Sequence, residues 1–272
     1  MRPTVCVLIP TFGRRETEIL SLCNALHVAG RVLVSNQCGE DAARLLDDRT
    51  QLINSASIGV SANRNVLLHH ANGDFNVFID DDCIICDDYE RIIVDAFYEH
   101  PDAEAILFSR DSNDDMFGPL YLKNKKVRRF SDISALGAPG IAIRKDAIQR
   151  HHLSFNEKLG TPNYFFNGED SAFLMQMIHK KMTMYTSSIP LFALFPSERA
   201  SSYFSGYDAH FFESIGGVHY YLHRFLFPLY HIKRAVYYHK KTGMRFLKSL
   251  HHMISGKKKM KLALRSGEIS RD

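Results

Sequence analysis

The sequence predicts an α/β fold in which helices cover both faces of a mostly parallel sheet, followed by a basic helical tail. Through the first half of the chain, short apolar segments of β character alternate with segments whose apolar residues recur at helical spacing. The apolar segments are nearly continuous, as expected of strands that are buried on both faces. A length of 272 residues and a hydrophobic content of 45% suffice for one complete core with an appendage.

The first elements follow from local composition. Residues 4–9 form an apolar run of β character, which Pro10 ends. Residues 16–28 carry apolar side chains at helical spacing, and 31–35 form a second apolar strand. We expect residues 40–48 to be helical, which would continue the alternation of strand and helix.

The following elements lead to the most acidic part of the chain. A third strand is expected at 51–54, a helix from Val60 to Ala71, and a buried strand at 75–79. The second half is less regular. There we expect helices at 88–99 and 169–180, strands at 104–109 and 140–144, and a loop or hairpin over 111–132.

Charge is divided unevenly along the chain. From Arg224 to the end there are 13 Lys or Arg and 2 Asp or Glu, whereas residues 1–223 have a net charge of −7. We therefore expect a main domain over 1–215 and a basic, aromatic-rich helical tail over 216–272. Amphipathic helices on an anionic membrane surface have this composition. A surface for single-stranded nucleic acid and a merely solvated tail are the alternatives.

No segment predicts insertion into a membrane or export. The chain has no window of about 18 apolar residues, and the run from Val5 to Ile9 is too short for a signal peptide. The five cysteines show neither a disulfide framework nor a complete zinc-binding pattern, in keeping with a reducing compartment. We expect a cytoplasmic protein.

Three adjacent carboxylates, Asp80, Asp81 and Asp82, directly follow an apolar strand. Carboxylates so close repel one another, and a divalent cation compensates that repulsion. Mg²⁺ and Mn²⁺ prefer oxygen ligands and often bridge one or two carboxylates to substrate phosphates. Ligands of parallel sheets bind beyond the carboxyl ends of the strands, where Pro10-Thr11 and 35–37 also fall. The alternative is a solvated acidic loop.

Two further sets of residues are candidates for chemistry. Glu169 and Asp170 stand after Gly168 at an expected helix start, where a carboxylate is either a general base or a simple helix cap. Arg64 lies in the first turns of the helix after Gly59 and could approach a phosphate, although an exposed helical arginine is the plainer interpretation.

Several stretches resemble, in order, the motifs of the family 2 glycosyltransferases, which have the GT-A (Rossmann-like) fold. They are VCVLIPTFGR at 5–14, SIGVSANRNVLL at 57–68, GDFNVFIDDDC at 73–83, ALGAPGIAIRKDAI at 135–148 and FNEKLGTPNYFFNGEDSAFL at 155–174. The resemblance runs over residues 4–190, roughly two thirds of the chain. Ordered motifs of this kind are far more specific than a single D-x-D.

The resemblance implies a role for each matching residue. The residues implied to bind the nucleotide are Pro10, Thr11, Asn36, Gly59, Arg64, Asp80 and Asp81. Asp82 would be the direct ligand of Mn²⁺ or Mg²⁺, with Asp80 also at the metal and nearer the ribose. Asp170 would be the catalytic base, with Glu169 beside it.

The chain also departs from the family pattern. The family often has an aspartate after its second strand, where Asn36 stands here. The family pattern E-D-x-D-L becomes Glu169-Asp170-Ser171-Ala172-Phe173, and Gln176 replaces an expected arginine. These departures concern the identity of the donor sugar.

The resemblance implies an inverting glycosyltransferase that moves a sugar from a nucleotide diphosphate, expected to be UDP, to a hydroxyl. The acceptor would be a glycan or a polyprenyl-linked intermediate of cell-surface polysaccharide synthesis. Lipid-linked acceptors favour an anionic membrane as the partner of the tail, on the cytoplasmic face of the inner membrane, and we expect no nucleic acid. A sugar nucleotidyltransferase and a catalytically silent nucleotide- or glycan-binding protein are the alternatives.

Overall fold

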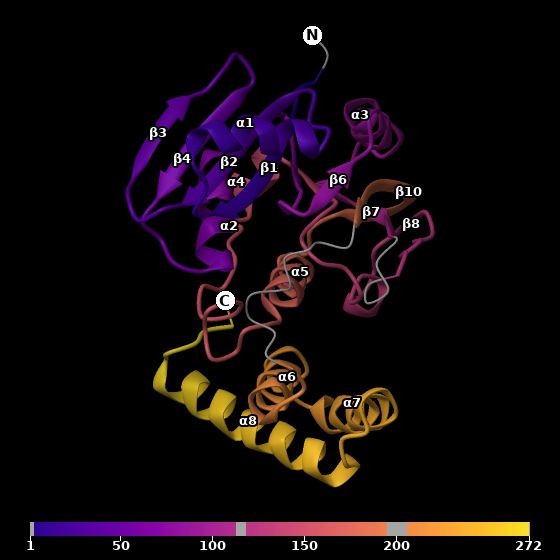
Figure 1. Cartoon of the computed structure of the whole chain (residues 1–272). Coiled ribbons are helices and arrows are strands. Elements are labelled where there is room, and N and C mark those ends of the chain that lie inside the picture. Colours follow the sequence, from indigo (N-terminus) through magenta and orange to yellow (C-terminus); the bar gives the residue numbers. More distant parts are fainter. Residues whose placement is uncertain (1–2, 113–117, 195–205, 272) are drawn as a thin grey trace. The chain divides into compact units, whose positions relative to one another are not determined.

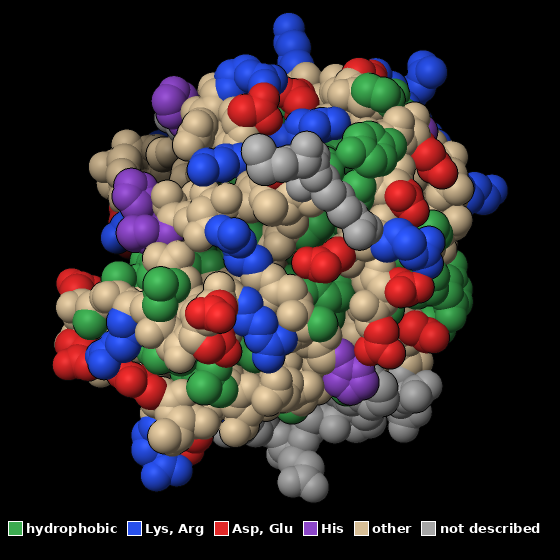
Figure 2. All heavy atoms as spheres, turned by 90° about the horizontal axis from the view of Figure 1, so that it is seen from above, with side chains coloured by type: hydrophobic (Ala, Val, Ile, Leu, Met, Phe, Trp, Pro, Cys, Tyr) green, Lys and Arg blue, Asp and Glu red, His purple; other side chains and the backbone are tan. Residues whose placement is uncertain are grey.

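The computed structural model describes residues 3–112, 118–194 and 206–271. The chain forms two compact units. The first unit comprises Met1–Ile58, Ala62–Ser154 and Gln176–Glu198, and the second comprises Gly59–Ser61, Phe155–Met175 and Arg199–Asp272. On the face of the molecule in Figure 2, basic and acidic side chains are interspersed.

The first unit is built on a ten-stranded sheet with the order β3-β4-β2-β1-β5-β9-β7-β10-β6, and β8 pairs with β10 (Figure 1). Its strands are β1 (Val5–Phe12), β2 (Arg31–Gln37), β3 (Ala42–Leu45), β4 (Thr50–Ser55), β5 (Phe75–Phe78), β6 (Cys83–Ile85), β7 (Ala105–Ser112), β8 (Lys125–Lys126), β9 (Ile141–Arg144) and β10 (Met184–Leu194). Six of these strands, β4, β2, β1, β5, β7 and β10, run in one direction.

Helices accompany this sheet along the chain. They are α1 (Glu16–Ala25), α2 (Val60–His70), α3 (Tyr89–Glu99), α4 (Lys145–Arg150) and α5 (Glu169–His179), with a 3-10 turn at Phe130–Asp132. Val7 and Ile9 of β1 share one core with side chains of α1 and α3. Cys6 and Leu8 point to the opposite face and are also fully buried. The predicted α/β class, with a mostly parallel sheet covered on both faces, is confirmed.

The prediction of a helix over 40–48 was wrong. Residues Ala42–Leu45 form β3, which pairs antiparallel with β4 and closes that edge of the sheet. A tight turn sets the pairing, because Asp47 accepts hydrogen bonds from the backbone N–H groups of Arg49 and Thr50. Helix propensity in a short segment was overridden by hydrogen bonding to a neighbouring strand.

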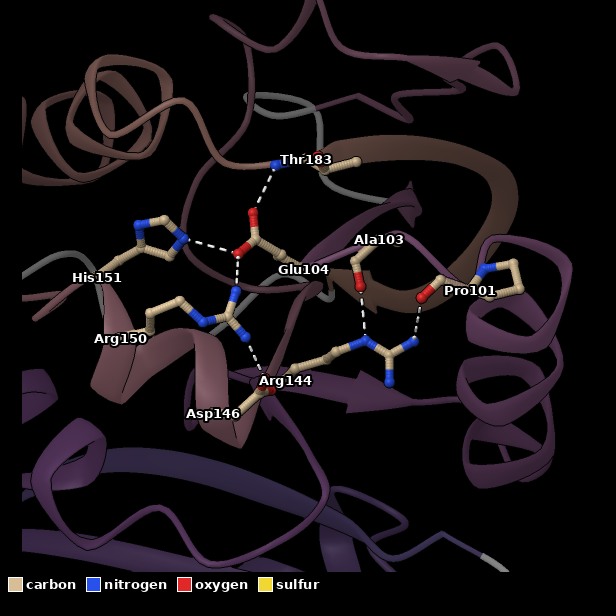
Figure 3. Close-up of polar contacts among 8 residues, drawn as sticks. All are labelled: Pro101, Ala103, Glu104, Arg144, Asp146, Arg150, His151 and Thr183. Carbon is tan, nitrogen blue, oxygen red and sulfur yellow. Dashed lines mark hydrogen bonds and ion pairs between the residues drawn. The ribbon is translucent and has the colours of Figure 1, made fainter.

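A polar cluster around Glu104 joins three elements of the first unit (Figure 3). Its carboxylate accepts from the backbone N–H of Thr183 at 2.8 Å, contacts Nε2 of His151 at 2.7 Å and pairs with Arg150 at 2.5 Å. Burial alone would raise the pKa of Glu104, but these partners outweigh it and lower the pKa. The cluster holds the start of β7 and the start of β10 to the end of α4.

Replacing Glu104 by Gln is expected to destabilise the protein by about 1–3 kcal/mol at pH 7, because the bonds to His151 and Arg150 are lost or weakened. A lowered folded-state pKa gives stability that is present above the unfolded-state pKa and disappears as pH falls through the folded-state value. The difference in the free energy of unfolding between Glu104→Gln and the unsubstituted protein, measured by chemical denaturation, should therefore shrink below about pH 4.3. Glu99→Gln, at an exposed position of α3, is the matched control; an equal loss in both variants would contradict this role.

The second unit contains α6 (Ala209–Leu222), α7 (Phe227–Thr242) and α8 (Phe246–Ser266). Helices α6 and α8 approach closely where glycines face the partner backbone. A methyl group on Gly216 would lie 2.1 Å from the carbonyl oxygen of Met253, and one on Gly256 would lie 1.8 Å from that of Glu213. Among the described helices, none combines the length and the hydropathy needed to cross a membrane.

Candidate active site

Polar residues of the first unit meet where β1, β2 and β5 end. The parallel register places Thr11 of β1 directly beside Asn36 of β2, and Asp80–Asp82 follow β5, the other neighbour of β1. Pro10 is buried in β1 one residue earlier. The prediction that these clusters share one edge of the sheet is confirmed, as the topology of a parallel sheet requires.

Arg64 of α2 reaches the first of the three aspartates. It is 3% exposed, and its Nη2 lies 3.0 Å and 3.3 Å from the two carboxylate oxygens of Asp80. The interpretation of Arg64 as an exposed helical arginine is therefore wrong. This pair neutralises one carboxylate of the triplet and fixes its direction.

The second aspartate is compensated from β1 and the loop after it. Asp81 accepts a hydrogen bond from Thr11 Oγ1 at 2.6 Å and pairs with Arg14 at 3.0 Å. Arg14 Nε also donates to Thr11 Oγ1 at 2.9 Å, which closes a triangle of three side chains. The sharp turn that brings Arg14 back to the sheet has Gly13 at a φ of 64°, in the left-handed region that favours glycine.

Asp82 differs from its two neighbours because it has no cationic partner among the residues that the structure describes. Its side chain reaches solvent, and its carboxylate accepts a hydrogen bond from the Cys83 thiol at 3.4 Å. Burial by the surrounding protein and the negative charges of Asp80 and Asp81 raise its pKa. A cation placed at this carboxylate would remove a repulsion that the chain itself leaves uncompensated.

The oxygen donors here suit Mg²⁺ or Mn²⁺, which are commonly held by one or two carboxylates and complete their coordination with substrate phosphates and water. Within the described ranges, no group of three or more His, Cys, Asp or Glu side chains is arranged to hold a metal ion by itself. Adjacent carboxylates at a strand end are a donor set that fits a metal shared with a phosphate-containing ligand.

Asn36 is buried at the end of β2, where it supports the loop after β1. Its amide oxygen accepts from the backbone N–H of Arg14 at 3.1 Å. Its amide nitrogen donates to the carbonyl of Arg14 at 2.9 Å and to Asn54 at 3.2 Å. Both ends of the Asn36 amide are therefore engaged within the protein.

Sequence reasoning did not select two residues that belong to this network, Arg14 and Asn63. Asn63, directly before Arg64, is 3% exposed and donates from Nδ2 to the carbonyl oxygen of Thr11 at 2.9 Å. Both residues stand inside the stretches that carried the resemblance, so their place in those stretches was the available signal. Side-chain chemistry alone did not separate them from surface residues.

Glu169, Asp170 and Gly59 lie in the second unit. Glu169 and Asp170 form the first turn of α5, as predicted, and both are partly buried. Gly168 before them has a φ of 87°, and a methyl group there would lie 2.4 Å from the side chain of Val218 in α6. The sequence therefore needs glycine at this helix start.

Glycine is also required at Gly59, within the same unit. Its φ is 103°, and a methyl group would lie 3.0 Å from the carbonyl oxygen of Thr161. The backbone N–H of Val60 donates to that same oxygen at 3.0 Å. Gly59 thus allows the start of α2 to pack against the segment around Thr161.

Solved structures with a similar fold include TarS of S. aureus. Residues 1–349 of TarS in complex with UDP-GlcNAc match with a TM-score of 0.58 and 17% identity, over 79% of this chain and 65% of that one. The same fragment in complex with UDP matches with a TM-score of 0.55 and 16% identity, over 79% of this chain and 64% of that one. A longer TarS structure matches with a TM-score of 0.55 and 15% identity, over 81% of this chain and 40% of that one. The chain thus spans a little under two thirds of the TarS fragment. Identities this low show a shared fold.

Sequence comparison defines the family more closely. No curated protein sequence matches the chain. The model of the family described as glycosyl transferase family 2 matches residues 35–176, which is just over half of the chain. This stretch includes Arg64, the three aspartates and the Glu169-Asp170 pair. The chain therefore belongs to glycosyl transferase family 2.

Proposed function

We propose that the protein is an inverting, metal-dependent glycosyltransferase that moves a sugar from a UDP-sugar to a hydroxyl group of a glycan or lipid-linked acceptor in cell-surface polysaccharide synthesis. The observation that carries the proposal is the state of the three aspartates after β5. Two are neutralised by arginines, while the solvent-accessible third has no cationic partner among the described residues. The UDP-GlcNAc and UDP bound in the TarS structures support the choice of donor.

In this proposal the carboxyl edge of the sheet binds the nucleotide. Pro10, Thr11 and Asn36 line the place of the base, and Gly59 permits the turn that starts α2. Arg64 orients Asp80 toward the ribose, because its guanidinium fixes the direction of that carboxylate. Asp81 keeps the loop after β1 in position through Thr11 and Arg14.

Asp82 would hold the Mn²⁺ or Mg²⁺ ion, with Asp80 as a second oxygen donor. When bound, such an ion acts as a Lewis acid that neutralises the charge developing on a leaving nucleotide diphosphate. The contribution of the chain is to present an accessible carboxylate whose ionised form is destabilised by partial desolvation and by Asp80 and Asp81 until a cation arrives.

Asp170 would accept the proton of the attacking acceptor hydroxyl, since a hydroxyl is a weak nucleophile at neutral pH. Its position in the first turn of α5 stabilises the ionised carboxylate through the helix dipole. Glu169 would orient the acceptor beside it. One direct displacement inverts the configuration at the anomeric carbon, with no covalent sugar–enzyme intermediate.

Product analysis separates this function from the two alternatives. Incubation with a UDP-sugar, Mn²⁺ and an acceptor that carries a free hydroxyl should form the glycosylated acceptor and UDP, which NMR or mass spectrometry identifies. A sugar nucleotidyltransferase would instead form pyrophosphate from UTP and a sugar 1-phosphate. A silent binding protein would bind the UDP-sugar and leave it intact. Either of these results would contradict the proposed activity.

The tail provides a surface that suits an anionic membrane. Leu229, Ile232 and Val236 recur at helical spacing on α7, are 65%, 48% and 42% exposed, and follow Phe225, which is 85% exposed. The basic residues on and beside this helix are Arg224, Lys233, Arg234, Lys240 and Lys241. Apolar side chains can enter the lipid boundary while the basic ones meet anionic headgroups. We therefore propose a catalytic domain over 1–215 and a membrane-binding tail over 216–272, on the cytoplasmic face of the inner membrane.

Replacing Leu229 and Ile232 together by Glu is expected to weaken binding to vesicles rich in phosphatidylglycerol by at least about 10-fold, because two apolar contacts become repulsive charges. High salt should weaken the binding of the unsubstituted protein. Vesicle co-sedimentation measures both effects. The control is Leu45→Glu on β3, because Leu45 is 74% exposed and lies outside the tail. Equal binding by both variants, or salt-sensitive binding to single-stranded RNA in place of vesicles, would contradict the membrane proposal.

A further inference from the structure

Arg110 adds a positive charge to the edge of the sheet that carries the three aspartates. Strands β7 and β5 both pair antiparallel with β9, so they run in the same direction. Arg110 is the sixth of the eight residues of β7 and lies toward its carboxyl end. It therefore stands at the same edge of the first unit as Asp80–Asp82, although no part of the site described so far includes it.

Strand register relates Arg110 to the segment that follows Asp82. Strand β10 separates β7 from β6, and Phe192 of β10 pairs with Arg110 on one side and with Ile85 on the other. Strand β6 begins at Cys83, directly after Asp82.

The guanidinium of Arg110 is poorly satisfied within the protein. Its Nε atom is buried without a hydrogen-bond partner, and its Nη2 donates to the carbonyl of Gly118 at 3.4 Å, the long limit for such a bond. Within residues 3–112, 118–194 and 206–271, no carboxylate lies at ion-pair distance from it. Burial lowers its pKa, since a partly desolvated cation is unfavourable.

Arg110 lacks the carboxylate partner that Arg14 and Arg64 have. Each of those arginines is matched to one aspartate of the triplet, so each has a partner in the unliganded protein. A half-buried arginine left without an anion costs free energy in the folded state. Such a cost is expected where a ligand, and not the chain, supplies the counter-charge.

We infer that Arg110 binds a phosphate-type anion of the reaction. The anion is either the diphosphate of the nucleotide donor or a phosphate of the acceptor. The inference rests on the proposed function and extends it to a residue that was not among the candidates. The planar guanidinium can donate two parallel hydrogen bonds to phosphate oxygens, and this geometry sets it apart from a lysine. Its role is to position the anion at the edge of the sheet that Asp82 occupies.

The test compares Arg110→Gln and Arg110→Lys with Arg91→Gln, which removes an exposed arginine paired with Asp88 on α3. Calorimetric titrations with Mn²⁺ measure the affinity for UDP, for uridine, and for inorganic pyrophosphate added to the UDP-saturated protein. If the donor supplies the anion, Arg110→Gln weakens UDP binding by about 10- to 100-fold, the scale of a charge-assisted hydrogen bond, and leaves uridine unaffected. If the acceptor supplies it, UDP binding is unchanged and pyrophosphate binding falls. Arg110→Lys recovers part of either loss.

Stability without ligand gives an independent readout. The unfolding midpoint of Arg110→Gln should equal or exceed that of the unsubstituted protein, because an uncompensated charge has been removed. A fall in the midpoint, or unchanged affinity for both UDP and pyrophosphate, would overturn the inference. Absence of UDP binding by the unsubstituted protein would instead contradict the proposed function, so the two failures are distinct.

Discussion

Replacing Asp170 by Asn is expected to reduce sugar transfer by about 10²-fold or more, the usual scale for loss of general-base assistance. Asparagine keeps the size of the side chain and cannot accept the proton of the acceptor hydroxyl at neutral pH. Affinity for UDP and Mn²⁺ should stay the same, because other residues, such as Asp82 and Arg64, are proposed to bind them. Single-turnover kinetics and calorimetry on one preparation separate the two effects.

Glu169→Gln is the matched control for this variant, since Glu169 stands in the same turn of α5 and is also partly buried. Glu169→Gln should reduce sugar transfer less than Asp170→Asn does if Glu169 orients the acceptor or stabilises the helix start. If Glu169→Gln reduces transfer more than Asp170→Asn does, Glu169 is the base. If both variants transfer sugar normally, the two carboxylates only start the helix, and the proposed mechanism is wrong.

Replacing Asp82 by Asn is expected to weaken metal-dependent binding of UDP by at least about 10²-fold. Loss of a residue that only supports a metal ligand lowers metal affinity by about 10- to 100-fold, so loss of the ligand itself should lower it at least as much. The metal-free variant should unfold at a slightly higher temperature than the unsubstituted protein, because one of three neighbouring negative charges is gone. Thermal unfolding with and without Mn²⁺ and UDP measures both effects.

Asp87→Asn is a suitable control, because it removes an exposed aspartate from the same acidic part of the chain. It should leave the metal dependence intact. If Asp82→Asn retains the same shift in unfolding temperature with Mn²⁺ and UDP as the unsubstituted protein, Asp82 is not the ligand. A lower unfolding temperature without metal would show that Asp82 contributes to the fold in a way that its surroundings do not explain.

Much of the fold could be predicted because buried parallel strands leave a strong local signal. The apolar runs at 4–9, 31–35 and 75–79 correspond to β1, β2 and β5. Strand β10 has no such signal, because its register with β7 shifts twice around Pro190 and interrupts the alternation of its side chains. Strand β6 is only three residues long. Short edge strands such as β3 depend on the neighbour that they pair with.

The candidate site was predictable to the extent that it lies at strand ends. Asp80–Asp82 stood out because three charges end a buried strand. Their pairing with Arg64 and Arg14 was not predictable, since it depends on how helix α2 and the loop after β1 pack at the end of β5. Arg110 gave no sequence signal, because its distinguishing property is the lack of a partner in the folded chain. The roles proposed for Glu169 and Asp170 stay predictions.

The central claim, that the protein uses a nucleotide sugar with a divalent metal, is tested most directly by a titration panel. UDP-GlcNAc and other UDP-sugars are added to the unsubstituted protein with Mn²⁺, with Mg²⁺ and with EDTA, and binding and UDP release are followed together. With metal, at least one UDP-sugar should bind saturably and release UDP as its sugar passes to an acceptor hydroxyl or, more slowly, to water, and EDTA should abolish the release. Absence of binding to every UDP-sugar in the presence of metal, or release that EDTA does not change, would contradict the account.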